Sequence, residues 1–369
     1  MCIIRKTPNP SEWQLIILGA LPPPRGGVTT HIQRLIPYLE EEGIRFTVWD
    51  HSKINKSKDH LIVLRREPLK AIFSLLKPGL KVLHCPLSAI NLGKTLFLLT
   101  LRMFGVRITV TLVASPDQTT VGRSRNYSYL YWLGRISNHL IATNSQIKEA
   151  LINLGIPPER ISVSSAFIPE KNESSDEQII PLDAEHFLSA RRPIVITYGH
   201  GPDFHDGQDL YGLDLFVEMA KNLLSNFPEA GFVIVIPEVH NKIYFAKIMD
   251  DIFRSGLSSH FFVASGNHIP FIPYLQRSDL FIRATNTDGD ALSLREALFY
   301  GITAVASNAS PRPEGTILFR SRDSEDLYRV ARQILDMRRD SRATASVRGI
   351  MNADFFVNVF RKAAGQRSP

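Results

Sequence analysis

The chain has 369 residues, of which 44% are hydrophobic and 21% charged, the composition of an ordinary globular protein. This length predicts two domains, and the two cysteines, Cys2 and Cys85, indicate neither a disulfide framework nor a metal site. No run of about 18 uncharged apolar residues occurs, so no membrane-spanning helix is predicted. The first residues lack the long apolar core of a secretory signal, and we expect a cytoplasmic protein.

The basic excess lies in the first half of the chain. Residues 1–180 hold 22 Lys and Arg against 14 Asp and Glu, net +8, whereas residues 181–369 hold 21 against 22, net −1. This asymmetry fits a plain solvated surface, or attraction to an anionic membrane or to phosphate-bearing acceptors. No nucleic-acid-binding motif accompanies the charge, so we do not expect nucleic acid as a partner.

The first predicted strand covers Trp13 to Gly19, an apolar run typical of the centre of a parallel sheet. Prolines at 22–24 and the pair Gly26 and Gly27 separate it from a predicted helix at 29–42 with one apolar face. A glycine pair between a strand and a helix lets a phosphate approach the backbone. The same pair also fits a plain tight turn.

Strands and helices then alternate along the first half. Predicted strands cover residues 46–49, 81–85, 107–112, 139–142 and 161–163, and predicted helices cover residues 88–104, 125–137 and 146–154. Such alternation predicts a parallel sheet with right-handed crossovers. Within it, Thr95 to Leu101 is apolar but flanked by Lys94 and Arg102. We expect a core helix there, with a helix that lies on a membrane as the alternative.

A polar stretch interrupts the pattern near the middle of the chain. Residues 166–192 are predicted as a linker, because Glu170 to Gln178 offers few core residues and prolines flank it. The alternation restarts with predicted strands at 193–198, 231–236 and 259–264 and helices at 212–226, 241–254, 323–338 and 342–364. We therefore expect an N-terminal domain at 1–165, a C-terminal domain at 193–345, and a final helical segment at 346–369 that can cross back to the N-terminal domain.

The stretch from Ser278 to Pro313 carries the clearest functional pattern. An apolar strand at 280–282 leads into a polar loop at 283–289, a helix at 291–300 and a second strand at 303–306. Such a unit places a ligand at the carboxyl end of its first strand and the amino end of its helix.

Two acids in this unit are spaced for ligand binding. Asp288 and Glu296 lie eight residues apart, slightly more than two helical turns. Asp288 and Asp290 either cap the helix or, together with its free N–H groups, hold a sugar diphosphate whose hydroxyls meet the carboxylates. Ser293 and Glu296 share one face of the helix.

The segment from Asp288 to Glu296, an acid, seven residues and a glutamate, resembles the motif of retaining family 4 glycosyltransferases. Its start, Asp-Gly-Asp-Ala where the family usually has Glu-Gly-Phe-Gly, is similar to the form in bacterial members that build surface polysaccharides. The resemblance covers nearly the whole chain. It extends to further matches at Ala297-Leu298, Gly301, Ala304 to Ser307, Arg312 to Gly315, and the loop of Gly26 and Gly27.

This resemblance implies the α/β fold called GT-B, with two Rossmann-like domains facing a central cleft. It implies an enzyme that moves a sugar from a nucleotide-diphosphate sugar to a glycan or lipid-linked acceptor, with retention at the anomeric carbon and without a metal ion or other cofactor. The N-terminal domain would bind the acceptor and the C-terminal domain the nucleotide sugar. The basic first half would allow peripheral contact with the inner face of a membrane.

Residues that match the family motifs have implied roles. Asp288 would hold the donor sugar, and Glu296 would hold the ribose of the nucleotide. Further donor contacts are expected from the glycine loops, the end of the strand and the helix start: Gly26, Gly27, Gly199, His200, Arg283, Gly289, Asp290, Ala291, Leu292 and Ser293. Acceptor contacts are expected near strand ends of the N-terminal domain: His84, Ser115 and Asp117.

Two departures from the family pattern bear on activity. Tyr211 stands where a lysine directed at the donor diphosphate is common, and His200 stands where an arginine is expected. We therefore expect Arg283 to offset phosphate charge, with a surface arginine or a pair with Asp288 as the alternatives. The N-terminal domain also lacks the family's histidine after its fourth strand, and His84 fits a structural role as well as an acceptor contact.

Two rival functions stay open. One is another GT-B enzyme, such as a nucleotide-sugar epimerase, and the other is a non-catalytic glycosyltransferase-like subunit, which Tyr211 favours. A glycosidase with Asp288 and Glu296 as its two carboxylates is rejected, because the predicted helix places Glu296 behind Asp288 rather than across a sugar from it.

Overall fold

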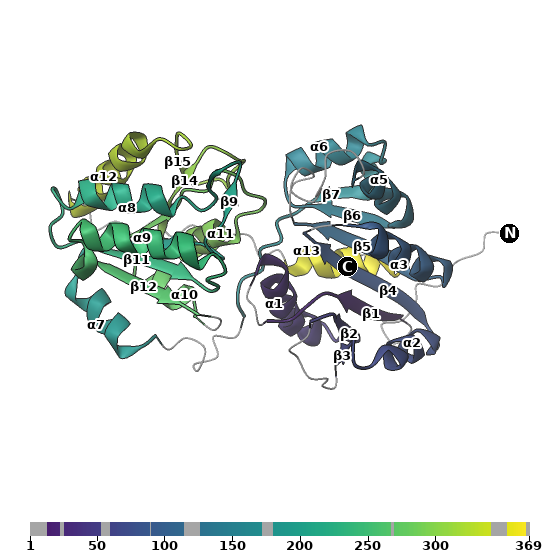
Figure 1. Cartoon of the computed structure of the whole chain (residues 1–369). Coiled ribbons are helices and arrows are strands. Elements are labelled where there is room, and N and C mark those ends of the chain that lie inside the picture. The colour runs from purple at the N-terminus through teal and green to yellow at the C-terminus, as the bar shows by residue number, and fades with distance from the viewer. Residues whose placement is uncertain are drawn as a thin grey trace. The chain divides into compact units, whose positions relative to one another are not determined.

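The computed structural model describes residues 13–22, 26–52, 60–88, 90–113, 126–171, 180–266, 269–340 and 353–366. The chain divides into two compact units, each built on its own sheet (Figure 1). The first unit takes Met1–Lys171 together with Met351–Pro369, and the second takes Asn172–Ile350. Among the described helices, none is long and apolar enough to cross a membrane.

The first unit is built on a seven-stranded parallel sheet in the order β3-β2-β1-β4-β5-β6-β7. Its strands are β1 (Trp13–Leu18), β2 (Phe46–Asp50), β3 (Leu61–Val63), β4 (Leu80–Leu87), β5 (Arg107–Leu112), β6 (His139–Ala142) and β7 (Ile161–Val163). The central strand β1 is apolar on both faces, as expected where helices cover both sides of a sheet. The chain reverses direction across the sheet between β1 and β4, which creates a topological switch point there.

Helices cover both faces of this sheet (Figure 1). They are α1 (Gly27–Glu41), α2 (Pro68–Leu76), α3 (Leu92–Met103), α5 (Asn126–Ile136), α6 (Ser145–Asn153) and α13 (Ala353–Ala363). One buried cluster joins α1 and α13 to the sheet, and the other joins α2, α3, α5 and α6 to the opposite face. The last described helix thus belongs to the first unit, where Phe356 and Phe360 are fully buried and Arg107 donates to the carbonyl of Ala363 at 2.6 Å.

The second unit has a six-stranded parallel sheet in the order β12-β11-β8-β13-β14-β15, and a separate two-stranded hairpin. The strands are β8 (Ile194–Tyr198), β9 (Phe204–His205), β10 (Gln208–Asp209), β11 (Gly231–Ile236), β12 (Phe261–Ser265), β13 (Leu280–Arg283), β14 (Thr303–Ser307) and β15 (Ile317–Phe319). With the hairpin set aside, the order is that of a dinucleotide-binding sheet, and its switch point lies between β8 and β13.

Helices also lie on both faces of the second sheet. They are α7 (Leu182–Ala190), α8 (Leu213–Leu223), α9 (Lys242–Arg254), α10 (Ile272–Gln276), α11 (Leu292–Phe299) and α12 (Ser324–Asp340). The core on one face includes α8, α9 and α12, and the core on the other includes α7, α10 and α11. Both faces of β13 are therefore packed in a core, with Leu280 and Ile282 on one side and Phe281 on the other.

The structure differs from the sequence-based expectation in three places. The segment expected as a linker contains the helix α7, whose Ala184 and Leu188 are buried in the core of the second unit. The residues between the second and third predicted strands form β3 and α2, and β15 follows β14. These elements are three to nine residues long, too short for a periodic pattern to stand out.

Candidate functional site

Three neighbouring strands of the second sheet end beside one carboxylate. Tyr198 ends β8, Arg283 ends β13 and Ser307 ends β14. These strands are adjacent, and the switch point lies between the first two. Asp288, in the loop after β13, is hydrogen-bonded to Arg283 at the end of β13 and to Arg312, which follows β14. The polar side chains therefore gather where open α/β sheets bind ligands.

Asp288 is held by two arginines. The Nε of Arg283 donates to its Oδ2 at 2.9 Å and the second terminal nitrogen donates to Oδ1 at 3.2 Å. The Nη1 of Arg312 donates to the same Oδ2 at 2.9 Å, and the hydroxyl of Thr285 donates to it at 3.2 Å. Oδ2 thus accepts three hydrogen bonds, whereas Oδ1 accepts one and keeps capacity for another donor.

A second layer of hydrogen bonds fixes Arg312. Its Nε donates to the carbonyl of Ser307 at 2.9 Å, and its Nη2 donates to the hydroxyls of Thr285 and Ser307, both at 2.9 Å. The hydroxyl of Ser307 donates in turn to the carbonyl of Thr285. The backbone N–H of Asp288 donates to Ser310 Oγ at 2.9 Å. The carboxylate and both guanidiniums are therefore rigidly placed.

The cluster carries a net positive charge in a buried setting. Two guanidiniums, Arg283 and Arg312, face the single carboxylate of Asp288, and all three side chains are largely buried. Burial alone would raise the pKa of Asp288, but the two arginines outweigh it and lower that pKa to about 2. The carboxylate is therefore ionised at neutral pH, and one positive charge is left over for an anionic ligand.

The aromatic ring of Tyr211 packs against the guanidinium of Arg283. The guanidinium of Arg283 lies 5.3 Å from the centre of the Tyr211 ring, a cation–π distance, and its Nη1 donates to the carbonyl of Tyr198 at 3.0 Å. A Cβ on Gly199 would meet the Tyr211 ring at 3.0 Å, so any larger residue there would require the ring to shift. The alternative that Arg283 is paired with Asp288 is confirmed.

The helix start after this loop is uncapped. The N-cap of α11 is Ala291, which makes no side-chain capping hydrogen bond. Asp288 does not cap the helix, because its carboxylate accepts from Arg283, Thr285 and Arg312. Asp290, which follows Gly289, instead accepts from Arg295 Nε at 2.5 Å. The backbone N–H groups at Leu292 and Ser293 lie in the first turn of α11, where a helix supplies no backbone acceptor for them.

Glu296 lies on the buried side of α11. Its side chain and that of Ser293 are buried, consistent with their expected shared helix face. The helix puts Glu296 one to two turns behind the loop that holds Asp288.

The expected donor residue His200 lies on the loop after β8. Its Nε2 is 3.5 Å from a carboxylate oxygen of Glu238, and its Nδ1 is buried without a hydrogen-bond partner among the described residues. A Cβ on Gly201 would collide with His240 and with the carbonyl of Glu238, so this loop packs tightly on the one after β11. No three His, Cys, Asp or Glu side chains of the described residues are placed to hold a metal ion.

The glycine pair of the first unit begins α1. Gly26 is its N-cap, with φ of −144°, and its N–H donates to Thr29 Oγ1 at 2.8 Å. A Cβ at Gly26 would meet nothing nearer than that oxygen at 3.9 Å. Neither backbone strain nor packing against described residues requires a glycine at position 26, which precedes Gly27, the first residue of the helix.

The expected acceptor residues are placed differently. His84 is fully buried, with Nδ1 3.1 Å from Thr109 Oγ1 and its ring 4.7 Å from that of Phe360 on α13. Burial, and then the charge of nearby His31, hold the pKa of His84 well below its usual value. This environment favours the structural role for His84. Ser115 and Asp117 lie outside the described residues.

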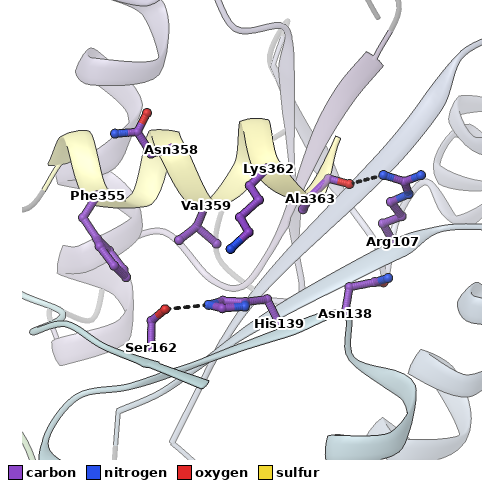
Figure 2. A pocket seen from close by; sticks show the side chains of 9 residues that line it. All are labelled: Arg107, Asn138, His139, Ser162, Phe355, Asn358, Val359, Lys362 and Ala363. Atoms are coloured by element: carbon purple, nitrogen blue, oxygen red, sulfur yellow. Dashed lines mark hydrogen bonds between the residues drawn. The ribbon is translucent and has the colours of Figure 1, made fainter. Parts of the chain in front are cut away.

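The first unit also contains a cavity of about 410 Å³ at the amino ends of β5 and β6 (Figure 2). Arg107 lines it from the sheet and Lys362 lines it from α13. His139 and Ser162 also line the cavity, and a hydrogen bond of 2.8 Å joins His139 Nε2 to Ser162 Oγ. The lining residues include no acid. None of the sequence-predicted site residues lines this cavity, which lies at the opposite edge of the sheet from the glycine pair.

No family model and no curated protein matches the chain. Solved structures match it in fold. HepE of Anabaena in complex with UDP-glucose gives a TM-score of 0.62 at 14% identity, over 95% of this chain and 98% of that chain. A glycosyltransferase of Rickettsia africae ESF-5 gives 0.66 at 13% identity, over 96% and 93%. The α,α-trehalose-phosphate synthase (UDP-forming) of Burkholderia vietnamiensis gives 0.65 at 12%, over 97% and 99%.

The chain has the GT-B fold. The expected fold class of two parallel α/β domains is thus confirmed by the two sheets and by these neighbours. In this GT-B chain, the sequence pattern located Arg283 and Asp288 but assigned no role to Arg312, Thr285, Ser307 or Ser310. The signal that could have found Arg312 is its position shortly after β14, beside the carboxyl end of β13.

Proposed function

We propose that the chain is a glycosyltransferase that takes its sugar from a nucleotide-diphosphate donor bound in the second unit. The observation that carries this proposal is the cluster of Arg283, Asp288 and Arg312 at the switch point of the sheet. Two buried arginines against one carboxylate leave a positive charge where α/β sheets bind phosphate-bearing ligands. The uncapped start of α11 adds N–H donors and the positive end of a helix dipole to the same place.

The fold neighbours support a nucleotide-sugar ligand. HepE of Anabaena is bound to UDP and glucose in one structure and to UDP-glucose in another, and MnaA of S. aureus is bound to UDP. At about 15% identity or less these likenesses carry no residue roles. Our assignment therefore rests on the charge and geometry of this chain's own cluster.

In this proposal the leaving diphosphate is stabilised electrostatically. Arg283 and the N–H groups of Leu292 and Ser293 would offset the charge that develops as the bond to the sugar breaks. Asp288 orients both arginines, and its less engaged oxygen Oδ1 accepts a hydroxyl of the donor sugar. Glu296 takes the ribose hydroxyls. From the sequence resemblance we also propose that the N–H groups of Gly26 and Gly27 contact a phosphate group of the donor, which requires the Gly26 N–H to give up its hydrogen bond with Thr29.

The finer assignments follow from the sequence resemblance. We propose hexosyl transfer with retention at the anomeric carbon, to a glycan or lipid-linked acceptor, in the synthesis of a surface polysaccharide. The first unit would bind the acceptor and the second unit the donor. A lipid-linked acceptor fits a cytoplasmic protein that associates peripherally with a membrane, which the net charge of +8 over residues 1–180 supports.

A second candidate function is a non-catalytic subunit that binds a nucleotide sugar. Tyr211 favours it, because a partly buried tyrosine occupies the position where the family commonly has a lysine directed at the diphosphate. Without that lysine, the positive charge available to the diphosphate comes from Arg283 and Arg312 alone. This candidate predicts nucleotide binding without transfer.

The test of the proposed function has two stages. Thermal unfolding against nucleotide diphosphates and their sugars reports a donor site, and transfer of radiolabelled sugar from the selected donor to a membrane lipid extract reports catalysis. Stabilisation with transfer supports the enzyme, and stabilisation without transfer supports the non-catalytic subunit. If no nucleotide binds, both candidates fail.

A further inference from the structure

Two helices of the first unit share one face of the sheet and carry an unusual outer surface. Ala71 of α2 and Leu98 and Leu101 of α3 are buried in the same core cluster, which places both helices on that face (Figure 1). Their opposite sides point away from the core. In an ordinary globular protein these outer sides would be polar.

The outer side of α2 is apolar. Leu69, Ile72, Phe73 and Leu76 are all exposed, Phe73 to 64%. They are spaced at three, four and seven residues from the first, which places them in one stripe along the helix. The helix contains no acidic residue.

The outer side of α3 repeats this pattern. Leu92, Leu96, Leu99 and Met103 are exposed, Met103 to 81%, and lie four, seven and eleven residues from the first. This spacing again forms one stripe. The helix is ordered at its start by Asn91, whose side chain accepts from the N–H of Lys94. The exposed leucines therefore belong to a well-formed helix with apolar residues on both its inner and outer sides.

The charge around the two stripes is almost wholly basic. Residues 65–104 include seven Lys or Arg and one Glu. Lys70 and Lys77 on or next to α2, and Lys94 and Arg102 on α3, are exposed beside the apolar side chains. Apolar stripes flanked by cations are complementary to an anionic lipid surface, in which the acyl region takes the side chains and the head groups take the charges.

A neighbouring helix adds interfacial aromatic residues. The helix α5 packs against α3, and its Tyr131 and Trp132 are exposed, Trp132 to 53%. Tyrosine and tryptophan favour the boundary between acyl chains and head groups, because each has an apolar body and a polar edge. These rings extend the apolar surface of α3.

We propose that the outer face of α2 and α3, with Trp132 beside it, docks the chain on an anionic lipid bilayer. Two copies of the chain would bring like charges together at this face, so self-association is opposed by repulsion. The proposal specifies the surface behind the peripheral membrane association stated above. It does not depend on the donor site, because every residue in it belongs to the first unit.

The chain contains its own reporter for this contact. Trp13 and Trp49 are buried and Trp132 is the remaining tryptophan, so a change of emission on docking comes from Trp132. We expect a blue shift with vesicles of phosphatidylcholine mixed with phosphatidylglycerol, none with phosphatidylcholine alone, and reversal by salt. Co-sedimentation with the same vesicles measures the partition coefficient independently.

Matched variants test whether membrane binding depends on the stripes of α2 and α3 or on any exposed apolar residue. Phe73→Ser with Met103→Ser should weaken partitioning by about tenfold or more, since large apolar side chains lose their burial in the bilayer. Lys94→Glu with Arg102→Glu should weaken it by at least about tenfold, as the attraction of two cations is reversed. Ile243→Ser with Phe253→Ser, which removes exposed apolar residues of α9 in the second unit, should leave partitioning unchanged.

All three variants alter exposed positions, so circular dichroism and nucleotide binding should match the wild type. This separates a failure of the docking proposal from a failure of the donor site. Absence of wild-type binding to the anionic vesicles, or stripe variants that bind as well as the wild type, would overturn the proposal. So would a dimer in light scattering that the stripe variants dissociate without any vesicle binding.

Discussion

Arg312 donates to the carboxylate of Asp288 across 24 residues of sequence, at 2.9 Å. The contact joins the segment after β14 to the loop after β13. It makes Asp288 the centre of a buried charge cluster rather than a helix cap. The donor site proposed for the second unit is built on this contact.

Removing the central carboxylate should destabilise the second unit. In Asp288→Asn, Arg283 and Arg312 would remain buried and face each other without an anion. We predict a loss of about 3 kcal/mol in the free energy of unfolding, the range for breaking a buried ion pair. Urea unfolding measures it, with Asp250→Asn, which breaks an exposed pair with Arg254 on α9, as a control that should change little.

The same cluster should make the free energy of unfolding depend on pH in the acid range. The folded pKa of Asp288 is about 2 against an ordinary value of 3.8. Because the folded pKa is lowered, the stabilisation is fully present above about pH 4 and is lost as the pH falls toward 2, by about 2 kcal/mol. The unfolding free energy of Asp288→Asn should lack this component. An identical acid slope in wild type and variant would contradict the charge assignment.

Buried histidines should make the first unit sensitive at a higher pH. Burial lowers the pKa of His31 to about 4 from 6.5, although a hydrogen bond with the carbonyl of Ala166 opposes the shift. Its neutral form is favoured in the fold, so stability is present above about pH 6.5 and declines as the pH falls toward 4, by about 3 kcal/mol. His31→Asn should be less stable at neutral pH but show a flatter decline in urea unfolding between these values.

The ring of Tyr211 should matter more than its hydroxyl. Tyr211→Phe keeps the surface against Gly199 and beneath Arg283, and we predict nucleotide affinity within about twofold of wild type, since cation–π attraction does not need the hydroxyl. Tyr211→Ala leaves a cavity and a less ordered arginine, and should weaken affinity by about tenfold. Isothermal titration measures both. Equal affinity in the alanine variant would show that Arg283 does not depend on this ring.

A side chain at Gly26 should block the ligand without harming the fold. Among the described residues a Cβ there meets only Thr29 Oγ1, at 3.9 Å, so Gly26→Ala should retain its melting temperature. We predict at least about tenfold weaker nucleotide binding, because the methyl would occupy the space needed for phosphate approach. Gly93→Ala, in the first turn of α3, is the matched control. Unaltered binding in Gly26→Ala would remove the glycine pair from the proposed site.

The sequence predicted the alternation of strands and helices well because central strands of parallel sheets are long apolar runs. The bounds of β6, β7 and β11 agree with the predicted ranges. The edge strands β3 and β15 were missed, since three residues are too few for a period to identify a strand reliably, although the equally short β7 was predicted. The helix α7 was missed because only Ala184 and Leu188 of its nine residues are buried.

The candidate site was predictable only in part, for a physical reason. Arg283 ends β13 and Asp288 lies in the loop that follows, so local spacing brings them together. Arg312 reaches the same carboxylate through the pairing of β13 with β14, and no local pattern encodes such a contact. Likewise, the burial of His84 depends on α13, which packs on it from the far end of the chain.

The most direct test of the donor site is a thermal unfolding panel with uridine, guanosine, adenosine and thymidine diphosphates and their sugars. Three proteins are compared: wild type, Arg283→Gln combined with Asp288→Asn, and Arg338→Gln, which alters the amino end of β13. We predict that one nucleotide stabilises the wild type and Arg338→Gln, by about 2.7 kcal/mol at a hundred times its Kd, and that the double variant loses this stabilisation while remaining folded. No shift with any nucleotide, or an undiminished shift in the double variant, would contradict the donor site proposed at Arg283, Asp288 and Arg312.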